Sequence, residues 1–245
     1  MGDLEIVTTS DRPDLDEQAS AAFRPIWPEF IFHSSFDRSY LERAGKYFAG
    51  FDVLLADGGE VVTGGWGVAL AWDGTAASLP QGYDEALITS VTQHEDSVPP
   101  DTLVIMAAAV RSGRRGRGLA GQALTALRDR ATSAGLPHVI APVRPTLKSR
   151  YPLTPMANFA RWNRADGLHL DPWIRAHQRL GATILGAAPQ SMTITGTVAE
   201  WEDWAKMAFP ETGQYIVPDA LDPVSIDHER DRGTYLESNL WMQHA

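Results

Sequence analysis

The chain has 245 residues, with 31 acidic and 21 basic side chains and a formal net charge of −10. A chain of this length buries about 70–75% of its unfolded surface on folding, so its core needs no disulfide or metal. The absence of cysteine excludes disulfides, thiolate nucleophiles and Cys-ligated zinc. No apolar run is long enough to span a membrane, and the acidic start MGDLEIVTTSDRPDLDE lacks a signal-peptide core. We therefore expect a cytoplasmic protein without a membrane partner.

The net charge is unevenly distributed along the chain. Residues 1–100 carry a net charge of −12, residues 101–180 carry +9, and residues 181–245 carry −7. Two interpretations of the basic middle remain open at this point. Its cations either pair with the acids of the flanking segments or hold an anionic ligand.

Hydrophobic periodicity and turn residues predict the elements of the first half of the chain. In chain order they are a strand over 4–8, helices over 13–23 and 39–50, hairpin strands over 51–56 and 61–72, a helix over 83–93, and a strand over 102–110. The last strand, TLVIMAAAV, is continuously apolar, which indicates burial on both faces. The Gly64-Gly65 pair inside a hairpin strand predicts a β-bulge.

The second half begins with a loop rich in glycine and arginine over 111–118. The elements predicted after it are a helix over 119–134, a strand over 138–143, an irregular basic insertion over 144–170, a helix over 172–180, a strand near 191–195, a helix near 197–208, and a hairpin of 224–226 with 235–242. Asp171-Pro172 is a typical helix start, with Asp171 as the N-cap. The order of elements indicates an α/β or α+β fold with a mixed sheet.

Four arginines lie within seven residues of the loop between the apolar strand and the following helix: Arg111, Arg114, Arg115 and Arg117. A helix N-terminus has free N–H groups and a partial positive charge, and no Ser, Thr, Asp or Asn stands here to cap it. Added arginines destabilise such an end unless an anion binds there. Gly116 and Gly118 let the backbone approach a ligand closely. The loop therefore predicts a diphosphate-binding site.

Two familiar phosphate loops match the sequence only in part. Residues 116–121 fit the dinucleotide pattern G-x-G-x-x-G, which would predict an NADP-dependent oxidoreductase. However, five residues separate the strand from the first glycine, and Arg144 follows the next strand where that pattern has an acid. A Walker loop is disfavoured because Leu119-Ala120 replaces its Lys-Ser/Thr pair.

The segment Arg115-Gly116-Arg117-Gly118-Leu119-Ala120 resembles the pyrophosphate motif Q/R-x-x-G-x-G/A of the GNAT superfamily of acyl-CoA-dependent N-acyltransferases. The resemblance implies a mixed, mostly antiparallel central sheet flanked by helices. It also implies a single domain over 1–245, with an insertion at 144–170 and an extended C-terminal part at 183–245.

The same resemblance assigns contacts to acetyl-CoA, the acyl donor. The strand backbone from Ala108 to Val110 would bind the pantetheine arm, and the backbone amides from Arg115 to Ala120, with Gly116, Arg117 and Gly118 between them, would hold the diphosphate. Arg111 and Arg114 would reach the other phosphate of CoA.

A second match lies downstream, where residues 173–182, WIRAHQRLGA, resemble the GNAT helix that ends L-Y-x-x-L-G-F. His177 takes the place of the tyrosine that protonates the departing CoA thiolate in that superfamily. The resemblance therefore implies the same role for His177, because imidazole can donate a proton near neutral pH. The alternative is that His177 is a buried core residue on one helix face with Trp173.

On the acceptor side, Trp162, Trp173 and Glu237 are predicted to contact the substrate. An amine acceptor must lose a proton before it attacks a thioester, so a base is expected. No acid lies within the apolar strand, and no single candidate stands out. The acids considered for this role are Glu95, Asp96, Asp101, Glu229 and Glu237.

The function predicted from these residues is an acetyl-CoA-dependent N-acetyltransferase that transfers the acetyl group directly to an amine in a ternary complex. The alternatives are the NADP-dependent oxidoreductase and a CoA-binding sensor module without catalysis. No metal is expected, because no His, Asp or Glu group has ligand spacing. A nucleic-acid partner is not expected either, because the acidic flanks would repel it. The acceptor's identity and a homodimer are left open.

Overall fold

The structure is a computed structural model that describes residues 4–245. Its strands are β1 (Glu5–Thr8), β2 (Asp52–Asp57), β3 (Glu60–Leu70), β4 (Thr102–Val110), β5 (His138–Val143), β6 (Thr183–Gly196), β7 (Gly213–Tyr215), β8 (Val224–Asp227) and β9 (Arg232–His244). Its α-helices are α1 (Asp16–Phe23), α2 (Ser39–Tyr47), α3 (Tyr83–Glu95), α4 (Leu119–Ser133), α5 (Met156–Phe159), α6 (Pro172–Arg179) and α7 (Val198–Ala205). None of the helices in this range is both long and apolar enough to cross a membrane.

The strands form one mixed sheet in the order β1-β2-β3-β4-β5-β9-β8-β7, and β6 pairs with β9 outside that path. Neighbouring strands are antiparallel except for β4 and β5, which are parallel. The predicted fold class, a mostly antiparallel sheet flanked by helices, is confirmed. This sheet is not the doubly wound parallel sheet that a dinucleotide-binding domain requires.

The predicted bulge at Gly64-Gly65 is wrong in position. The register between β3 and β4 shifts instead between Trp66 and Gly67, which leaves Met106 of β4 without a partner in β3. The two glycines have another reason to lack side chains. A Cβ on Gly65 would lie 2.6 Å from the carbonyl oxygen of Ala107 on the neighbouring strand.

Two helices position the functional residues described below. Helix α4 packs against β2, β3 and β4, and buries Ala123, Leu124 and Leu127 in the main core. Helix α6 begins where predicted, because the Asp171 carboxylate accepts hydrogen bonds from the backbone N–H groups of Trp173 and Ile174.

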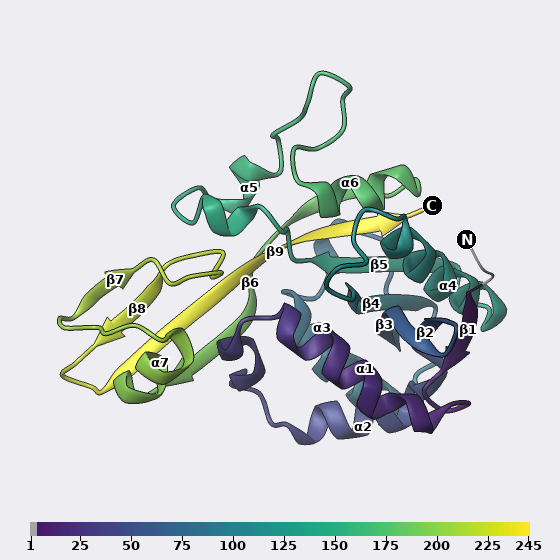
Figure 1. Ribbon diagram of the computed structural model, residues 1–245, viewed down its shortest axis with the longest axis horizontal. Coiled ribbons are helices and arrows are strands. Elements are labelled where there is room, and N and C mark those ends of the chain that lie inside the picture. The colour runs from purple at the N-terminus through teal and green to yellow at the C-terminus, as the bar shows by residue number, and fades with distance from the viewer. Residues whose placement is uncertain (1–3) are drawn as a thin grey trace.

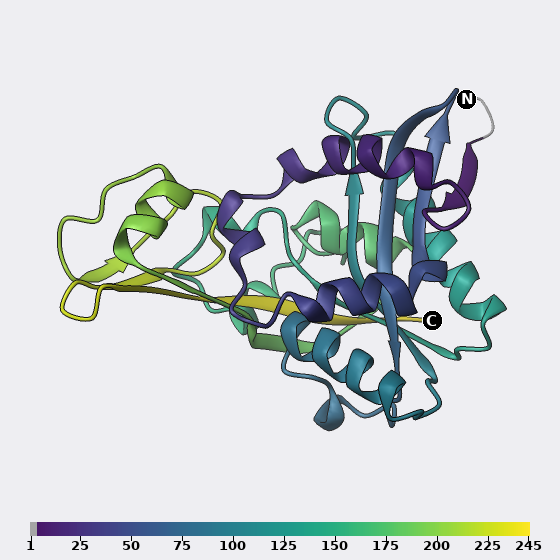
Figure 2. The same ribbon diagram turned by 90° about the horizontal axis from the view of Figure 1, so that it is seen from below.

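The C-terminal part forms an arm that projects from the rest of the molecule. In Figures 1 and 2 the outer ends of β6 and β9 carry α7, β7 and β8 away from the side on which both termini lie. The predicted strand near 191–195 is therefore only the outer part of β6, which begins at Thr183. The arm has its own apolar core, with Trp201, Phe209 and Tyr235 fully buried.

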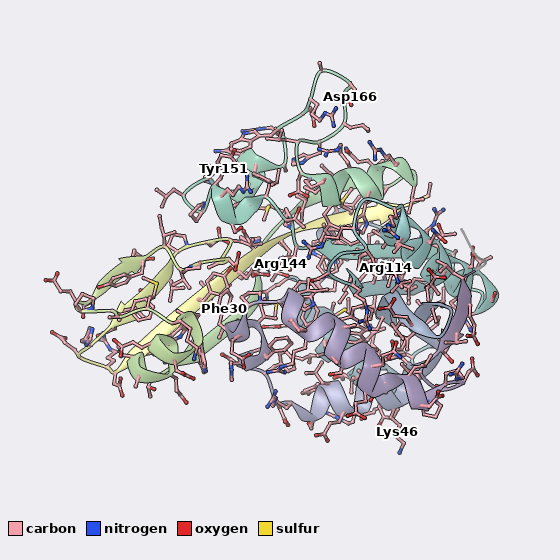
Figure 3. The ribbon with its side chains drawn as sticks, in the orientation of Figure 1. Phe30, Lys46, Arg114, Arg144, Tyr151 and Asp166 are labelled. Atoms are coloured by element: carbon pink, nitrogen blue, oxygen red, sulfur yellow. The ribbon has the colours of Figure 1, made fainter. Side chains whose placement is uncertain are left out.

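Phe30 connects the N-terminal segment to the arm. It lies in a short 3-10 helix (Glu29–His33) and packs on Trp201 and Tyr235, with ring centroids 5.8 and 5.4 Å away. Figure 3 shows Phe30 where the arm meets the rest of the molecule. This contact places the residues that follow Trp27 beside the cavity described next.

Candidate functional site

The β4 and β5 strands separate after a short stretch of pairing. They pair only over Thr102–Val104 and His138–Ile140. Beyond this point β4 continues to Val110 with β3 on one side, and β5 continues to Val143 with β9 on its other side. The edge of β4 that faces β5 therefore has no strand partner from Ile105 onward within the described chain. Ala108 and Val110, predicted to contact acetyl-CoA, lie on this part of β4.

A cavity of about 220 Å³ lies in the gap between the two strands. Residues of both strands line it, together with α6, β9 and the segment that follows α1. Its lining is mostly aromatic and aliphatic, with a few polar groups: Trp27, Ile31, Phe32, Ser34, Phe36, Arg38, Leu41, Trp66, Tyr83, Ile105, Met106, Ala107, Ala108, Ala141, Pro142, Val143, Arg144, Trp173, His177, Met192, Glu237 and Asn239. An apolar cavity with a few converging polar groups is typical of a small-molecule site.

The glycine- and arginine-rich loop connects this strand edge to the start of α4. Gly116 and Gly118 have φ angles of +81° and +76°, in the left-handed region that favours glycine. Gly118 is the N-cap of α4, and no side chain caps the helix. The first N–H groups of α4, including that of Ala120, are thus available to an anion.

The four arginines of the loop fall into two pairs. Arg111 and Arg114 both form ion pairs with Glu60 in the β2–β3 hairpin, and Arg111 Nε donates to the carbonyl oxygen of Val61 at 2.7 Å. Arg115 and Arg117 are exposed, and neither has an ion-pair partner in the part of the chain that the structure describes. The contacts of Arg111 and Arg114 support a structural role in place of the predicted contact to a CoA phosphate.

His177 is fully buried in α6 and lines the cavity. Its Nδ1 lies 2.9 Å from Nε2 of His244, and the Trp173 ring packs edge-on against it, with centroids 4.6 Å apart. Burial, and to a smaller extent His244, lowers the pKa of His177 to about 3. His177 is therefore neutral at physiological pH, and it cannot protonate a thiolate as a resident imidazolium.

Glu237 and Arg144 form a buried ion pair at the cavity. Arg144 Nε donates to the two carboxylate oxygens of Glu237 at 2.9 and 3.1 Å. The hydroxyl of Tyr235 and the side-chain amide of Asn239 donate to the same carboxylate at 3.0 and 3.1 Å. Figure 3 shows Arg144 near the middle of the molecule, beside β9. The prediction from sequence included Glu237 but gave Arg144 no role at the acceptor.

The two predicted tryptophans have different positions. Trp173 lines the cavity beside His177. Trp162 does not line it and packs instead against Tyr151 and Phe159 within the insertion, with centroids 4.8 and 5.1 Å away. The aromatic side chains that line the cavity in its place come from the N-terminal half of the chain.

Of the acids considered as a base, only Glu237 lines the cavity. Glu95 pairs with Arg43 at the surface, and Asp101 accepts a hydrogen bond from the backbone of Trp72. Sequence reasoning missed Asp84, which is largely buried near the cavity. Its carboxylate accepts hydrogen bonds from Thr193 N at 2.8 Å and from Ser34 Oγ at 3.2 Å, and burial raises its pKa to about 6. No grouping of His, Asp and Glu suited to a metal occurs within residues 4–245.

Comparison with known proteins gives one curated relative that matches nearly end to end. The chain is 28% identical to the arginine N-acetyltransferase avaD of Aspergillus versicolor over 269 residues, which cover 97% of this chain and 92% of the relative. No protein-family model matches the chain.

Two solved structures share the fold over their full length. One is the loading GNATL domain of CurA from Lyngbya majuscula, with a TM-score of 0.58, 14% identity and coverage of 99% of this chain and 98% of that one. The other is the GphF GNAT-like decarboxylase in complex with isobutyryl-CoA, with a TM-score of 0.58, 16% identity and coverage of 100% and 99%. The chain thus shares the fold of these GNAT-like structures, and it is similar along nearly its whole length to an arginine N-acetyltransferase.

Proposed function

We propose that the chain is an acetyl-CoA-dependent N-acetyltransferase that acts on a small amine. The observation that carries this proposal is the gap between β4 and β5 together with the uncapped N-terminus of α4, which follows β4 after a single loop. The name of the Aspergillus relative, an arginine N-acetyltransferase, supports the same reaction. The GNAT-like decarboxylase shares only the fold, so its activity is not carried over.

The acyl donor would lie along β4 and the loop that follows it. The unpaired edge of β4, including Ala108 and Val110, offers backbone N–H and C=O groups to an extended amide-containing chain. The amides from Arg115 to Ala120 would hold the diphosphate, and the exposed side chains of Arg115 and Arg117 would pair with it. Since Arg111 and Arg114 are held by Glu60, we leave them outside this set.

The acceptor would occupy the aromatic part of the same cavity. Trp173, Trp66 and Tyr83 supply aromatic rings, whose faces attract the cationic end of a small amine. The Glu237–Arg144 pair offers both a carboxylate and a guanidinium, the two groups that a zwitterionic amino acid requires. We therefore propose a small amine with the character of arginine as the acceptor.

The proposed reaction takes place in a ternary complex. The acceptor nitrogen, freed of its proton, attacks the thioester carbonyl, so that a C–N bond forms and the C–S bond breaks. The thiolate that leaves takes a proton, and the nitrogen loses its remaining extra proton. His177 is the titratable side chain of α6 that lines the cavity, and we retain it as the residue that protonates the sulfur.

The test is to incubate the chain with acetyl-CoA and a panel of arginine, lysine, putrescine, glycine and Nα-acetylarginine, and to follow free thiol. We expect thiol release above the hydrolytic background with arginine or another small cationic amine. Binding of acetyl-CoA without thiol release for any amine would favour the CoA-binding sensor. Absence of acetyl-CoA binding at millimolar concentration would contradict the proposed function altogether.

A further inference from the structure

Two buried histidines meet at the end of the cavity. His177 on α6 and His244 at the end of β9 are 67 residues apart in the chain, yet Nδ1 of the first lies 2.9 Å from Nε2 of the second. Their side chains are 1% and 4% exposed. At this distance one ring donates its N–H proton to the other, so each protonation arrangement of one histidine fixes that of its neighbour.

Each ring has a second nitrogen that the pair does not use. His177 Nε2 and His244 Nδ1 are both buried, and neither has a hydrogen-bond partner among the described residues. Buried polar atoms in folded proteins are nearly always paired, so two such atoms on one hydrogen-bonded pair require an explanation.

The two rings lie between two different cavities. His177 lines the cavity in the gap between β4 and β5. His244 lines a second cavity together with Arg128, Asp129 and Thr132 of α4, and the two cavities have no lining residue in common. The shared hydrogen bond joins His177 Nδ1 to His244 Nε2, so the nitrogens at the two ends of the pair are His177 Nε2 and His244 Nδ1.

We propose that His177 and His244 form a proton relay that connects the reaction cavity with the second cavity. His244 is then a positioning and proton-transfer residue that acts through His177. This inference rests on the proposed acetyl transfer, because the proton that the relay delivers is the one taken up by the departing thiolate.

The proton transfers leave both rings neutral at each stage, and the charge that arises in the second cavity is cancelled within the turnover. In the first arrangement each ring carries its proton on Nε2, and His244 Nε2–H donates a hydrogen bond to His177 Nδ1. His177 Nε2–H gives its proton to the sulfur as the C–S bond breaks. His177 Nδ1 then takes the proton of His244 Nε2, and His244 Nδ1 takes one from water in the second cavity. The hydroxide left there is neutralised when the relay later carries a proton of the amine in the opposite direction. Both rings end neutral, with protons on Nδ1.

In this second arrangement both protons are on Nδ1, and the first arrangement is restored when the next amine loses its proton. His177 Nε2 is now an acceptor, and it takes a proton from the attacking nitrogen while the relay returns one to the second cavity. One turnover thus moves a proton from the amine nitrogen to the CoA sulfur and leaves the protonation of both histidines unchanged. Burial lowers the pKa of His177 to about 3 and that of His244 to about 4. Each ring therefore stays neutral, and it passes a proton on without holding a second one. Arg128, which faces His244 from α4, acts in the same direction.

Substitution of His244 by glutamine separates the relay from simple packing. The glutamine amide takes about the place of histidine Nε2 and still donates to His177 Nδ1, but it cannot pass a proton on. We expect H244Q to lower kcat about 100-fold, the lower end of general acid–base contributions, with the Kd of acetyl-CoA unchanged. H177Q should do the same, and the H177Q/H244Q double variant should lose no more than either single variant, because the two act as one unit. The control is H94N, which changes an exposed histidine on α3.

An NMR measurement provides a readout besides activity. In the ¹⁵N spectrum of the unsubstituted protein we expect both rings to be neutral at pH 6, with one proton shared between His177 Nδ1 and His244 Nε2. In H244Q, His177 should be fixed with its proton on Nε2. Separate rings without a shared proton would overturn the relay even if a variant failed to fold.

The activity outcomes are equally distinct. A kcat for H244Q within twofold of the unsubstituted chain, with H177Q impaired, would show that His177 acts alone and overturn the relay. Equal losses of acetyl-CoA affinity and kcat in H244Q would assign His244 a structural role. If the unsubstituted chain transfers no acetyl group to any amine, the proposed function fails, and the NMR spectrum still decides whether the two rings share a proton.

Discussion

At the scale of single residues, side chains that are neighbours in sequence have separate tasks. Arg114 and Arg115 are adjacent, yet Arg114 pairs with Glu60 while Arg115 lies exposed at the start of α4. The sequence left open whether the basic middle pairs with the acidic flanks or holds an anion, and both interpretations apply to different arginines. The amino-acid composition could not tell which arginines pair with acids and which are left for an anion. That division depends on which hairpin of the sheet lies beside the loop in the fold.

The first prediction concerns the exposed pair. R115E/R117E should raise the Kd of acetyl-CoA by at least about 100-fold, because each charge-assisted hydrogen bond to a phosphate contributes about 1.5–3 kcal/mol. Calorimetric titration measures this affinity. K46E is a control that reverses one charge outside the loop, since Lys46 is exposed on α2, away from the loop in Figure 3. Its Kd should equal that of the unsubstituted chain. An unchanged Kd in R115E/R117E would reject the diphosphate assignment.

The second prediction concerns the histidine pair and acid stability. His177 and His244 have folded-state pKa values of about 3 and about 4, below the ordinary value of 6.5. A depressed pKa stabilises the fold above pH 6.5, and this contribution is lost as the pH falls toward the folded-state values. Between pH 7 and pH 5 the free energy of unfolding should therefore decrease by about 2 kcal/mol per histidine.

Urea denaturation at pH 7 and at pH 5 measures this difference. In H177Q/H244Q the decrease between the two pH values should be much smaller, since glutamine does not titrate. A double variant that loses stability with acid as steeply as the unsubstituted chain would show that both rings are protonated in the folded state, contrary to the buried neutral pair.

At the scale of elements, the continuous segment from β4 to α4 could be predicted and the gap beside it could not. The apolar run TLVIMAAAV, the glycines and the helical spacing after Leu119 are local signals, and the structure has all three elements within a residue or two of the predicted bounds. The point at which β4 and β5 part depends on which strand lies next to β5. That strand is β9, more than 90 residues further along the chain.

The third prediction separates two glycines at the start of α4. Gly118 has a φ of +76°, whereas Gly121 has helical backbone, and a Cβ on either would meet nothing within 4 Å. G118A should therefore lower the free energy of unfolding by about 1 kcal/mol through backbone strain alone. G121A should raise it by about 0.5–1 kcal/mol, because alanine is the better helix former.

Chemical denaturation of the two variants checks this pair. Opposite signs would support the left-handed N-cap, and G121A is the control for the added methyl group. A stabilised G118A would mean that the helix starts earlier than Gly118 and that its first amides are not free for an anion.

At the scale of the whole molecule, one sheet links two cores. The main core holds the β4–β5 gap and α4, and the arm core lies around Trp201 at the far ends of β6 and β9. Hydrophobic patterning predicted the local elements of the arm, a strand, a helix and a hairpin. It did not predict that β6 and β9 would each extend through both parts, because a long strand shows no local break where its partners change.

The whole-molecule arrangement also explains which acceptor residues were missed. Glu237 was predicted, but Arg144 and Asn239, which line the cavity, and Asp84, which lies near it, were not. Arg144 follows β5 and Asp84 lies on α3, so only the fold brings them near β9. Trp162 was predicted for the cavity from its aromatic character alone, and the insertion instead forms a cluster of its own.

The fourth prediction tests whether the arm is independent of the donor site. Gly233 pairs with Gly196, and a Cβ on Gly233 would lie 2.1 Å from Cδ1 of Trp201. G233A should therefore loosen the arm core and expose residues 197–232 to limited proteolysis, while the Kd of acetyl-CoA stays the same. G213A is the control, because its Cβ would meet nothing within 4 Å. A G233A variant with a weakened Kd would show that the arm supports the donor site.

The proposed reaction moves an acetyl group from the CoA sulfur to an amine nitrogen. Its most direct measurement uses acetyl-CoA labelled with ¹³C in the acetyl group, with arginine as the first acceptor, and product analysis by mass spectrometry and NMR. We expect labelled N-acetylarginine, or the labelled amide of a related small amine, in amounts equal to the CoA released. Release of CoA with the label recovered only as acetate, or with no label on any amine, would contradict it.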